Sequence, residues 1–493
     1  MRGVYVFPLL FGCLMAGASH AAECGSLVNL TLPQTEITLA EIVPAGPTDY
    51  GKEKVGQPPN RDADRLPAYC RVAGTVEPAI RFEVWMPVDG WNGRFQGIGN
   101  HRFAGTIPTA DMGMEMARGY AVAGTDTGHT EGDTAWMQSQ QQLEDYGYRG
   151  IHEMTVKAKE VVKAFYEKPA DYAYFNGCST GGKQGLTQAQ RYPEDYDGIV
   201  VGDPNNSQSG NRAQYVWTAQ VTFAKPETTI PKEKLAVLNK AVMDACDGGD
   251  GLADGMISNP LECQFDVAVL TCSAGQDESQ CLTPAQVEAV NKVYQGPVNP
   301  RTGESVYPGF SYGSELRWGQ FVAGPKVFPT AAQFFGNVVF KKADWDYTTF
   351  DFDKDMAVVQ ESAAKLVDAV ETDLSGMLQS GGKILHYHGW SDVNHTPLYT
   401  VRYYDAVRKT MGEDKTSSFY RLFMEPGGDG CGSDFDPLPP LVDWVEKGVA
   451  PDRIASVSRG TGPTAGKERP ICAYPKIARW TGQDAASGSF TCE

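Results

Sequence analysis

The pentapeptide Gly177-Cys178-Ser179-Thr180-Gly181 has residue types and spacing that indicate catalysis. A G-x-S-x-G pattern between a strand and a helix raises a serine hydroxyl on a sharp turn at the end of a parallel sheet. The apolar, β-prone run 172–175 precedes this pattern, and a helix-like stretch, 182–191, follows it. The context predicts Ser179 as the nucleophile of a serine esterase. The pattern by itself also describes an ordinary glycine-rich turn.

A candidate acid follows a later strand. The β-prone run Lys383–Tyr387 leads into His388-Gly389-Trp390-Ser391-Asp392. In α/β-hydrolases the catalytic residues follow one another in the order serine, acid, histidine. Asp392 is therefore the expected orienting carboxylate, with a loop-capping aspartate as the alternative.

A third candidate site is the acidic, glycine-rich segment 247–256. It places Asp247, Asp250 and Asp254 in a short loop whose backbone carbonyls are also available as ligands. Hard oxygen ligands in a tight loop suit Ca²⁺ rather than a softer metal, although the EF-hand spacing and its terminal Glu are missing. The spacing alone is equally compatible with a solvated acidic turn.

Alternating element types must position these residues. Strand-like runs at 81–86 and 120–123 alternate with helix-like stretches at 153–167 and 398–408. This alternation predicts an α/β fold, a parallel sheet covered by helices. Between residues 206 and 374 the pattern changes, with four cysteines, the acidic loop and several aromatic stretches. We interpret 206–374 as an insertion into a domain made of 22–205 and 375–493.

The first residues predict export. Arg2, a short apolar stretch and small residues before position 22 are typical of a signal peptide covering 1–21, and the alternative is a lipoprotein signal ending at Cys13. No later segment has the ~18 uninterrupted apolar residues that span a bilayer. Removing Cys13 leaves ten cysteines, an even number that fits an oxidising compartment. The predicted location is secreted or periplasmic.

The charge balance excludes some partners. The formal net charge of -18 repels phosphate backbones and anionic lipid, so neither nucleic acid nor a membrane surface is an expected partner. The 493 residues, with 41% hydrophobic and 21% charged, are typical of a globular chain of two or three folding units.

Short motifs spread over the whole mature chain match those of a known family: 91–95, 119–122 with 125–129, 175–182, 191–198, the acidic loop, 388–392 and 444–451. On these residues the sequence resembles the tannase and feruloyl esterase family, which also includes a bacterial hydrolase of mono(2-hydroxyethyl) terephthalate. The resemblance implies an α/β-hydrolase fold in which the insertion is a lid, and hydrolysis of small aromatic carboxylic esters of feruloyl, galloyl or terephthaloyl type.

The same resemblance implies residue roles. It implies the disulfide pairs Cys24–Cys70, Cys178–Cys431, Cys246–Cys263, Cys272–Cys281 and Cys472–Cys492, which use all ten remaining cysteines. It implies a structural Ca²⁺ held by the side chains of Asp247, Asp250 and Asp254 and by the carbonyls of Leu252 and Met256. Oxyanion donors are implied at the Thr180 amide and in the loop from Asn100 to Arg102, near His101.

One position departs from the family. The last catalytic motif of the family places His directly before Cys, but here Gly430 precedes Cys431. A serine without a base loses most of its reactivity, so we expect an impaired esterase. The alternatives are an active esterase with His101 or His395 as a relocated base, an inactive homologue that binds aromatic ligands, and a sequence altered at position 430.

Overall fold

The computed structural model describes residues 23–49, 64–324, 327–432, 434–457, 466, 468–482 and 489–493. The predicted signal peptide, 1–21, lies outside the described residues, so the export prediction stays a prediction. Within the described part of the chain, no helix is both long and apolar enough to cross a membrane.

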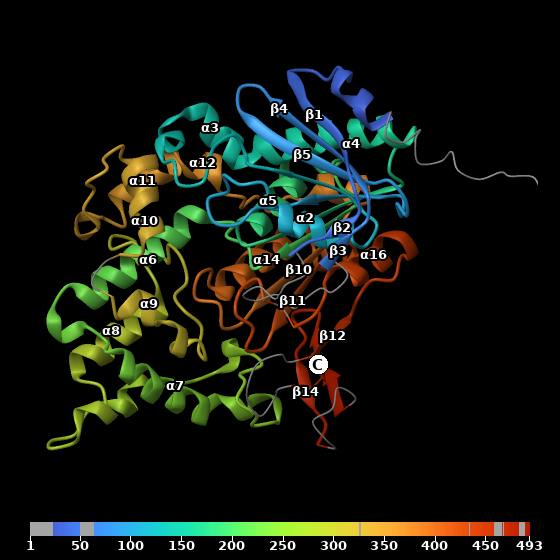
Figure 1. Ribbon diagram of the computed structural model, residues 1–493. Helices are drawn as coiled ribbons and strands as arrows, with labels where there is room; N and C mark the ends of the chain where they lie inside the picture. Colours follow the sequence, from blue (N-terminus) through green and yellow to red (C-terminus); the bar gives the residue numbers. More distant parts are fainter. Residues whose placement is uncertain are drawn as a thin grey trace, which may run out of the picture.

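A nine-stranded mixed sheet forms the centre of the molecule (Figure 1). In spatial order its strands are β1 (Thr35–Val43), β4 (Tyr69–Val76), β5 (Ile80–Pro87), β7 (Ala121–Thr125), β6 (Arg94–Ile98), β8 (Tyr172–Cys178), β9 (Gly198–Gly202), β10 (Lys383–Gly389) and β11 (Tyr420–Glu425). The strands from β7 to β11 run parallel, whereas β1, β4, β5 and β7 pair antiparallel.

The prediction of a parallel sheet is therefore correct for only part of the sheet. The run 81–86 lies in β5, which pairs antiparallel with β7. The chain turns directly from β4 into β5 over three residues, 77–79, and a connection that short joins only antiparallel strands. Sequence periodicity identifies such strands but not their direction.

Side chains alternate between two cores because successive residues of a strand face opposite sides of the sheet. In β8, Ala173 and Phe175 belong to one core and Tyr174 to the other. The first core lies under α4 (Gly150–Tyr166), α5 (Thr180–Arg191), α13 (Ser375–Ser380), α14 (Pro397–Met411) and α15 (Glu413–Phe419). The second lies under α2 (Thr109–Met116) and α16 (Leu438–Lys447). Both faces are covered, which is why β9 is wholly buried and the residues of β8 are buried or half-buried.

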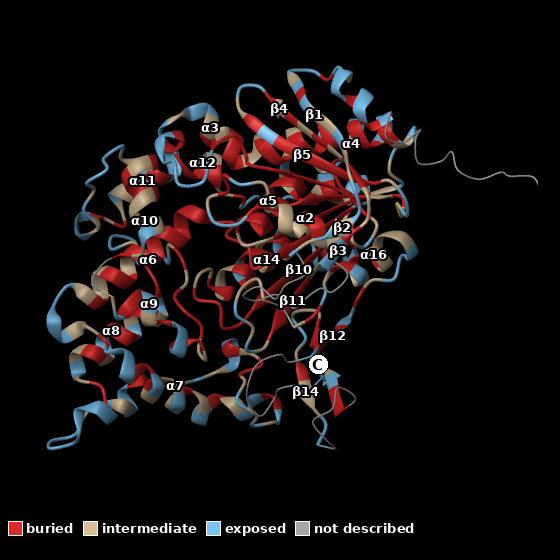
Figure 2. Ribbon diagram, viewed as in Figure 1, coloured by how far each residue is buried: buried red, intermediate tan, exposed pale blue. Residues whose placement is uncertain are grey.

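A helical region lies between β9 and β10 in the sequence and beside the sheet in space (Figure 1). It contains α6 (Gln208–Phe223), α7 (Lys232–Cys246), α8 (Pro284–Gln295), α9 (Gly319–Val322), α10 (Pro329–Gln333), α11 (Lys354–Glu361) and α12 (Ala364–Val367). Its aromatic side chains form a third core around Trp318, Phe334 and Phe335, which Trp136 and Tyr146 join from the short helix α3 (Gln140–Glu144) and its flanks. Figure 2 shows that this region exposes much of α7 and α8, whereas the central strands are buried.

The ten cysteines form the five pairs that the resemblance implies: Cys24–Cys70, Cys178–Cys431, Cys246–Cys263, Cys272–Cys281 and Cys472–Cys492. Cys178–Cys431 joins the end of β8 to the loop after β11. Three small ladders complete the described structure: β2 (Gly46–Pro47) with β3 (Arg65–Leu66), β12 (Arg453–Val457) with β13 (Glu468–Cys472), and β14 (Ala478–Trp480) with β15 (Phe490–Cys492).

Candidate active site

Ser179 lies on a strained turn between β8 and α5. Its φ of 60° and ψ of -116° are unusual for a residue with a side chain, and such strain is typical of a nucleophile elbow. The Ser179 amide donates to the carbonyl of Gly202 at 2.9 Å, which ties the turn to the end of β9. Among the described residues, no hydrogen bond reaches the Ser179 hydroxyl.

The glycines around Ser179 allow the turn to be this tight. A β-carbon at Gly177 would lie 2.5 Å from the carbonyl group of Gly181, so the strand and the helix approach too closely for any side chain. On the other side, a β-carbon at Gly99 would lie 2.6 Å from the α-carbon of Gly181. The loop after β6 therefore lies directly against the start of α5.

Asp392 lies in the loop after β10 and is fully buried. Its Oδ1 accepts hydrogen bonds from the amides of Asn394 at 2.7 Å and His395 at 3.3 Å. Its Oδ2 lies 3.4 Å from Nε2 of His388 and 3.6 Å from Nδ1 of His395, but accepts no hydrogen bond of good geometry among the described residues. Burial raises the pKa of Asp392, yet the two imidazoles outweigh it and hold this pKa below its ordinary value.

The inserted region holds the Asp392 loop in place. The carbonyl of Asn394 accepts hydrogen bonds from the side chains of Asn211 at 2.8 Å and Tyr215 at 2.5 Å, both on α6. The carbonyl of Trp390 accepts one from the Ser311 hydroxyl at 2.5 Å. The position of the acid therefore depends on the insertion as well as on the sheet.

Gly430 faces this acid. A β-carbon at position 430 would lie 3.2 Å from Oδ2 of Asp392 and 3.5 Å from Oδ1. The next residue, Cys431, is joined to Cys178, the neighbour of Ser179. A side chain at position 430 would thus start beside the acid and one residue from the disulfide to Cys178, at the position where the family histidine is expected.

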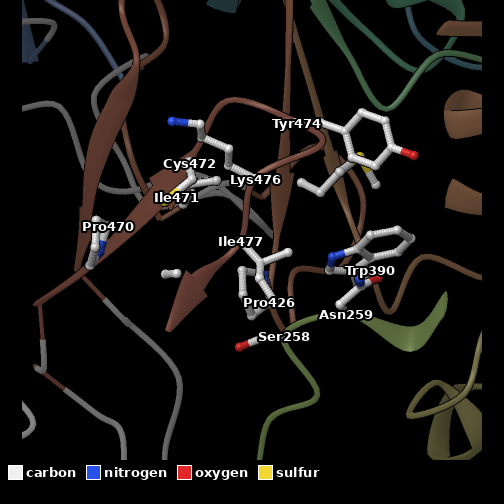
Figure 3. Close-up of a pocket in the computed structure, with 12 residues that line it drawn as sticks. Ser258, Asn259, Trp390, Pro426, Pro470, Ile471, Cys472, Tyr474, Lys476 and Ile477 are labelled. Atoms are coloured by element: carbon white, nitrogen blue, oxygen red, sulfur yellow. The ribbon is translucent and has the colours of Figure 1, made fainter. Parts of the chain in front are cut away.

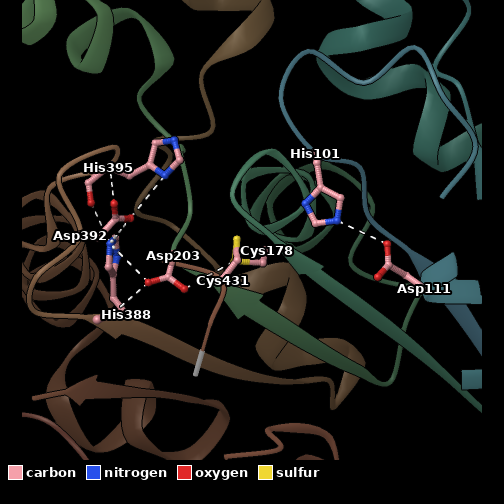
Figure 4. The surroundings of a disulfide bond; sticks show 9 residues. His101, Asp111, Cys178, Asp203, His388, Asp392, His395 and Cys431 are labelled. Atoms are coloured by element: carbon pink, nitrogen blue, oxygen red, sulfur yellow. Dashed lines mark hydrogen bonds and ion pairs between the residues drawn. A yellow bond between two sulfur atoms is a disulfide. The ribbon is translucent and has the colours of Figure 1, made fainter. Parts of the chain in front are cut away.

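The described histidines make no hydrogen bond with Ser179. Six of the seven lie in the described structure, and none hydrogen-bonds to Ser179. Four have partners elsewhere: His101 with Asp111, His129 with the carbonyl of Phe103, His152 with Asp195, and His386 with Tyr420. Figure 4 shows His101 turned toward Asp111, on the other side of the Cys178–Cys431 disulfide from Asp392. His395 and His388 alone lie beside Asp392.

Asp203 and His388 also belong to this cluster, but neither was predicted from the sequence. Asp203 follows β9, and its Oδ1 accepts a hydrogen bond from the Gly389 amide at 2.9 Å. His388, the last residue but one of β10, lies between Asp203 and Asp392. The signal that could have identified both residues is their place at the ends of β9 and β10. The carboxyl ends of neighbouring parallel strands lie at one edge of the sheet, so such residues come close together.

The implied oxyanion donors lie beside the elbow. Thr180 is the first residue of α5, so its amide has no partner within the helix. The Thr180 hydroxyl donates to the carbonyl of Arg102, which holds the loop after β6 against the helix. The Asn100 amide donates to Gln184 at 2.9 Å and is therefore not available. The amides of His101 and Arg102 have no hydrogen-bond acceptor in the described structure.

The acidic loop contains the right type of ligand for Ca²⁺, but it also has an internal cation. The Asp247 carboxylate accepts hydrogen bonds from the amides of Asp254, Gly255 and Met256 at 2.9–3.2 Å. Arg469 of β13 pairs with Asp250 at 2.7 Å and with Asp254 at 3.3 Å. Asp247, Asp250 and Asp254, with the carbonyls of Leu252 and Met256, would hold a structural Ca²⁺. Since Arg469 already balances two carboxylates, the metal stays a prediction.

Two cavities are lined by residues in or just after this loop, and neither is lined by Ser179. One of about 20 Å³ lies between Trp390, Tyr474 and Ile477 (Figure 3) and has room for about one water molecule. The other, of about 220 Å³, is lined by residues that include Asp250, Glu262 and Gln264.

Comparison with known proteins identifies the family of this chain. Residues 65–492 match the sequence profile of the family described as tannase and feruloyl esterase. The chain belongs to this family. A similar relative is an uncharacterised esterase of Xanthomonas campestris pv. campestris, which is 35% identical over 98% of this chain and 93% of its own length. The chain is therefore of carboxylic ester hydrolase type, with the α/β-hydrolase fold.

Two solved structures are similar over nearly the whole chain. The crystal structure of feruloyl esterase B from Aspergillus oryzae is 29% identical and has a TM-score of 0.86, covering 96% of this chain and 100% of that one. Tannin acyl hydrolase from Aspergillus niger is 20% identical with a TM-score of 0.77, covering 96% and 94% of the two chains, and this likeness shows the fold alone.

Proposed function

We propose that this member of the tannase and feruloyl esterase family is a secreted serine esterase for aromatic carboxylic esters, impaired by the glycine at position 430. The observation that carries this proposal is that Gly430 lies against Asp392, while its neighbour Cys431 is bonded to Cys178, the neighbour of Ser179. The strained serine and the buried acid are retained. A side chain at position 430 would start 3.2 Å from Oδ2 of the acid, but the glycine there provides no imidazole.

In the proposed reaction, Oγ of Ser179 attacks the ester carbonyl, and the amides of Thr180 and His101 stabilise the oxyanion. The tetrahedral intermediate then expels the alcohol and leaves an acyl-enzyme, which water hydrolyses to the free acid and Ser179. A general base must take the serine proton and return it to the leaving alcohol. The family histidine would do so, with Asp392 fixing its orientation, and at position 430 this base is missing.

One observation favours a second candidate, in which His395 is a relocated base. Its Nδ1 lies 3.6 Å from Oδ2 of Asp392. Burial lowers the pKa of His395, and Asp392 offsets this only in part, so the ring is neutral at pH 7 and able to accept a proton. The argument against this candidate is that His395 makes no hydrogen bond with Ser179. The third candidate, a protein that binds aromatic ligands without turnover, would retain the fold but not an activated serine.

Labelling with a fluorophosphonate, followed by mass spectrometry, tests the proposal. We expect slow covalent labelling at Ser179, none in Ser179→Ala, and slow turnover of feruloyl, galloyl or terephthaloyl aryl esters. Rapid labelling would favour the relocated base. Complete absence of labelling and turnover, in a folded protein that still binds an aromatic acid, would support the binding protein and contradict the esterase.

A further inference from the structure

His388 lies in the centre of a buried acidic cluster. Its side chain and those of Asp203 and Asp392 are each at most 2% exposed. Nε2 of His388 lies 3.7 Å from Oδ1 of Asp203 and 3.4 Å from Oδ2 of Asp392 (Figure 4). One imidazole thus lies between two carboxylates from two different strand ends.

Hydrogen bonds fix the orientation of this ring. Nδ1 of His388 is hydrogen-bonded to the Thr400 hydroxyl of α14 at 2.7 Å, and Nε2 donates to the carbonyl of His395 at 2.8 Å. The second bond spans the acid loop, because His388 and His395 flank Asp392 on either side. Both ring nitrogens are engaged, so the ring has no lone pair left for a metal ion.

The charge balance favours a protonated ring. Two carboxylates without a compensating cation would be very costly to bury. The titratable groups that face His388 are Asp203 after β9, His386 on β10, and Asp392 and His395 in the acid loop. Of these, the two histidines are both poor cations, because burial lowers the pKa of each. Arg317 also interacts electrostatically with Asp392 but forms no ion pair with it in the described structure, so His388 is the group that pairs directly with both carboxylates.

The pKa directions agree with this geometry. Burial by itself would lower the pKa of His388, but Asp203 and Asp392 outweigh it and raise the pKa above its ordinary value. Burial raises the pKa of Asp203 to about 6, and the second carboxylate contributes to that rise. The raised pKa of His388 and the lowered pKa of Asp392 both favour a proton on the imidazole rather than on the acid.

We propose that His388 is a positioning residue for Asp392, a buried imidazolium that anchors the acid loop through the His395 carbonyl and keeps Asp392 ionised. The inference deepens the proposed function, since it rests on Asp392 as the acid of the esterase. It gives the protein a permanent partner for the acid, independent of any residue at position 430.

Nuclear magnetic resonance of protein labelled with ¹⁵N-histidine tests the protonation state without any need for activity. As the pH rises from 5 to 8, we expect both ring nitrogens of His388 to stay protonated to a higher pH than those of a free imidazole, and Asp392→Asn to lower the pKa of that ring. His386→Gln is the matched control, because His386 is equally buried two residues earlier on β10 but bonds to Tyr420. A His388 ring with a single protonated nitrogen throughout this range would overturn the proposal.

Rates in the Gly430→His background test the positioning role. There we expect His388→Gln to lower kcat by about tenfold, as loss of an outer partner of a functional side chain often does, and to move the acidic limb of the pH–rate profile to higher pH. His386→Gln should change neither. An unchanged rate and profile in folded His388→Gln would refute positioning. If Ser179 proves inert in every background while the ring is an imidazolium, the esterase assignment fails and the charge of His388 stands.

Discussion

A β-carbon at Gly430 would lie 3.2 Å from Oδ2 of Asp392, an oxygen that is buried and accepts no hydrogen bond among the described residues. The position that should carry the base thus faces the acid directly. Gly430 also has a φ of 39°, a region that a side chain enters only with strain. Restoring a histidine here requires a small shift of the loop, which the disulfide at Cys431 limits.

The first prediction concerns this position. Gly430→His should raise the rate of aryl ester hydrolysis by about 10²–10⁴-fold, because a positioned general base typically contributes that much. Steady-state kinetics measure it, with Gly430→Ala as the control for the strain alone. An unchanged rate in folded Gly430→His, with Cys178–Cys431 intact by disulfide mapping, would mean that the serine and the acid are not working parts of one site.

The second prediction concerns the relocated base. In the unmodified chain we expect His101→Ala and His395→Ala to leave the slow hydrolysis unchanged, because neither ring hydrogen-bonds to Ser179. His101 instead contacts Asp111 at 3.4 Å and is half exposed. Measured kcat/KM values for both variants decide this. If the unmodified protein is fast and one of these alanine changes abolishes its activity, the impaired-esterase proposal is wrong and that histidine is the base.

The third prediction concerns the acidic loop. If Ca²⁺ binds Asp247, Asp250 and Asp254, excess chelator should lower Tm and added Ca²⁺ should restore it, because an ion that binds only the folded state stabilises it. Elemental analysis should then find calcium. The Tm of Arg469→Met should be measured alongside, since Arg469 pairs with two of the carboxylates. Unchanged Tm in chelator with no bound metal, and a large loss of Tm in Arg469→Met, would make Arg469, rather than a metal ion, the cation that balances Asp250 and Asp254.

Much of the fold follows from local sequence signals. The apolar run 172–175 and the glycines around Ser179 locate the strand, elbow and helix because each is a short-range property of the chain. The antiparallel start of the sheet was missed because strand direction depends on connection length and pairing partners. The change in sequence pattern after residue 206 coincides with the helical region between β9 and β10, but it does not reveal the hydrogen bonds from α6 to the Asp392 loop.

The site was predictable only in part for a similar reason. The order of Ser179 and Asp392 along the chain follows from the fold class, whereas Asp203 and His388 matter because two strand ends meet. A histidine inside a strand most often indicates nothing more than a polar residue in the core. His388 and His386 are equally buried. What distinguishes them is that His388 lies close to two carboxylates, whereas His386 is hydrogen-bonded to Tyr420.

The fourth prediction concerns Glu425, at the end of β11 beneath the loop of Gly430. Burial raises its pKa to about 8, although the Asp434 amide donates to its Oε1 at 2.8 Å. Between its ordinary pKa and about 8, the folded protein holds a proton that the unfolded chain releases. The stability that the folded protein gains from this bound proton is therefore fully present at low pH and is lost as the pH rises toward 8.

Glu425→Gln should accordingly reduce the fall in stability between pH 5 and pH 8, because glutamine fills the same space without a charge to bury. Each pH unit in which the two states differ by one proton changes the free energy of unfolding by about 1.4 kcal/mol. Denaturant unfolding at several pH values measures the slope. Glu361→Gln serves as the control, since Glu361 is exposed and paired with Lys365. Parallel curves for Glu425→Gln and the unmodified protein would show that Glu425 is ionised in the fold, and a buried carboxylate beneath the Gly430 loop would then need a cation that the described residues do not provide.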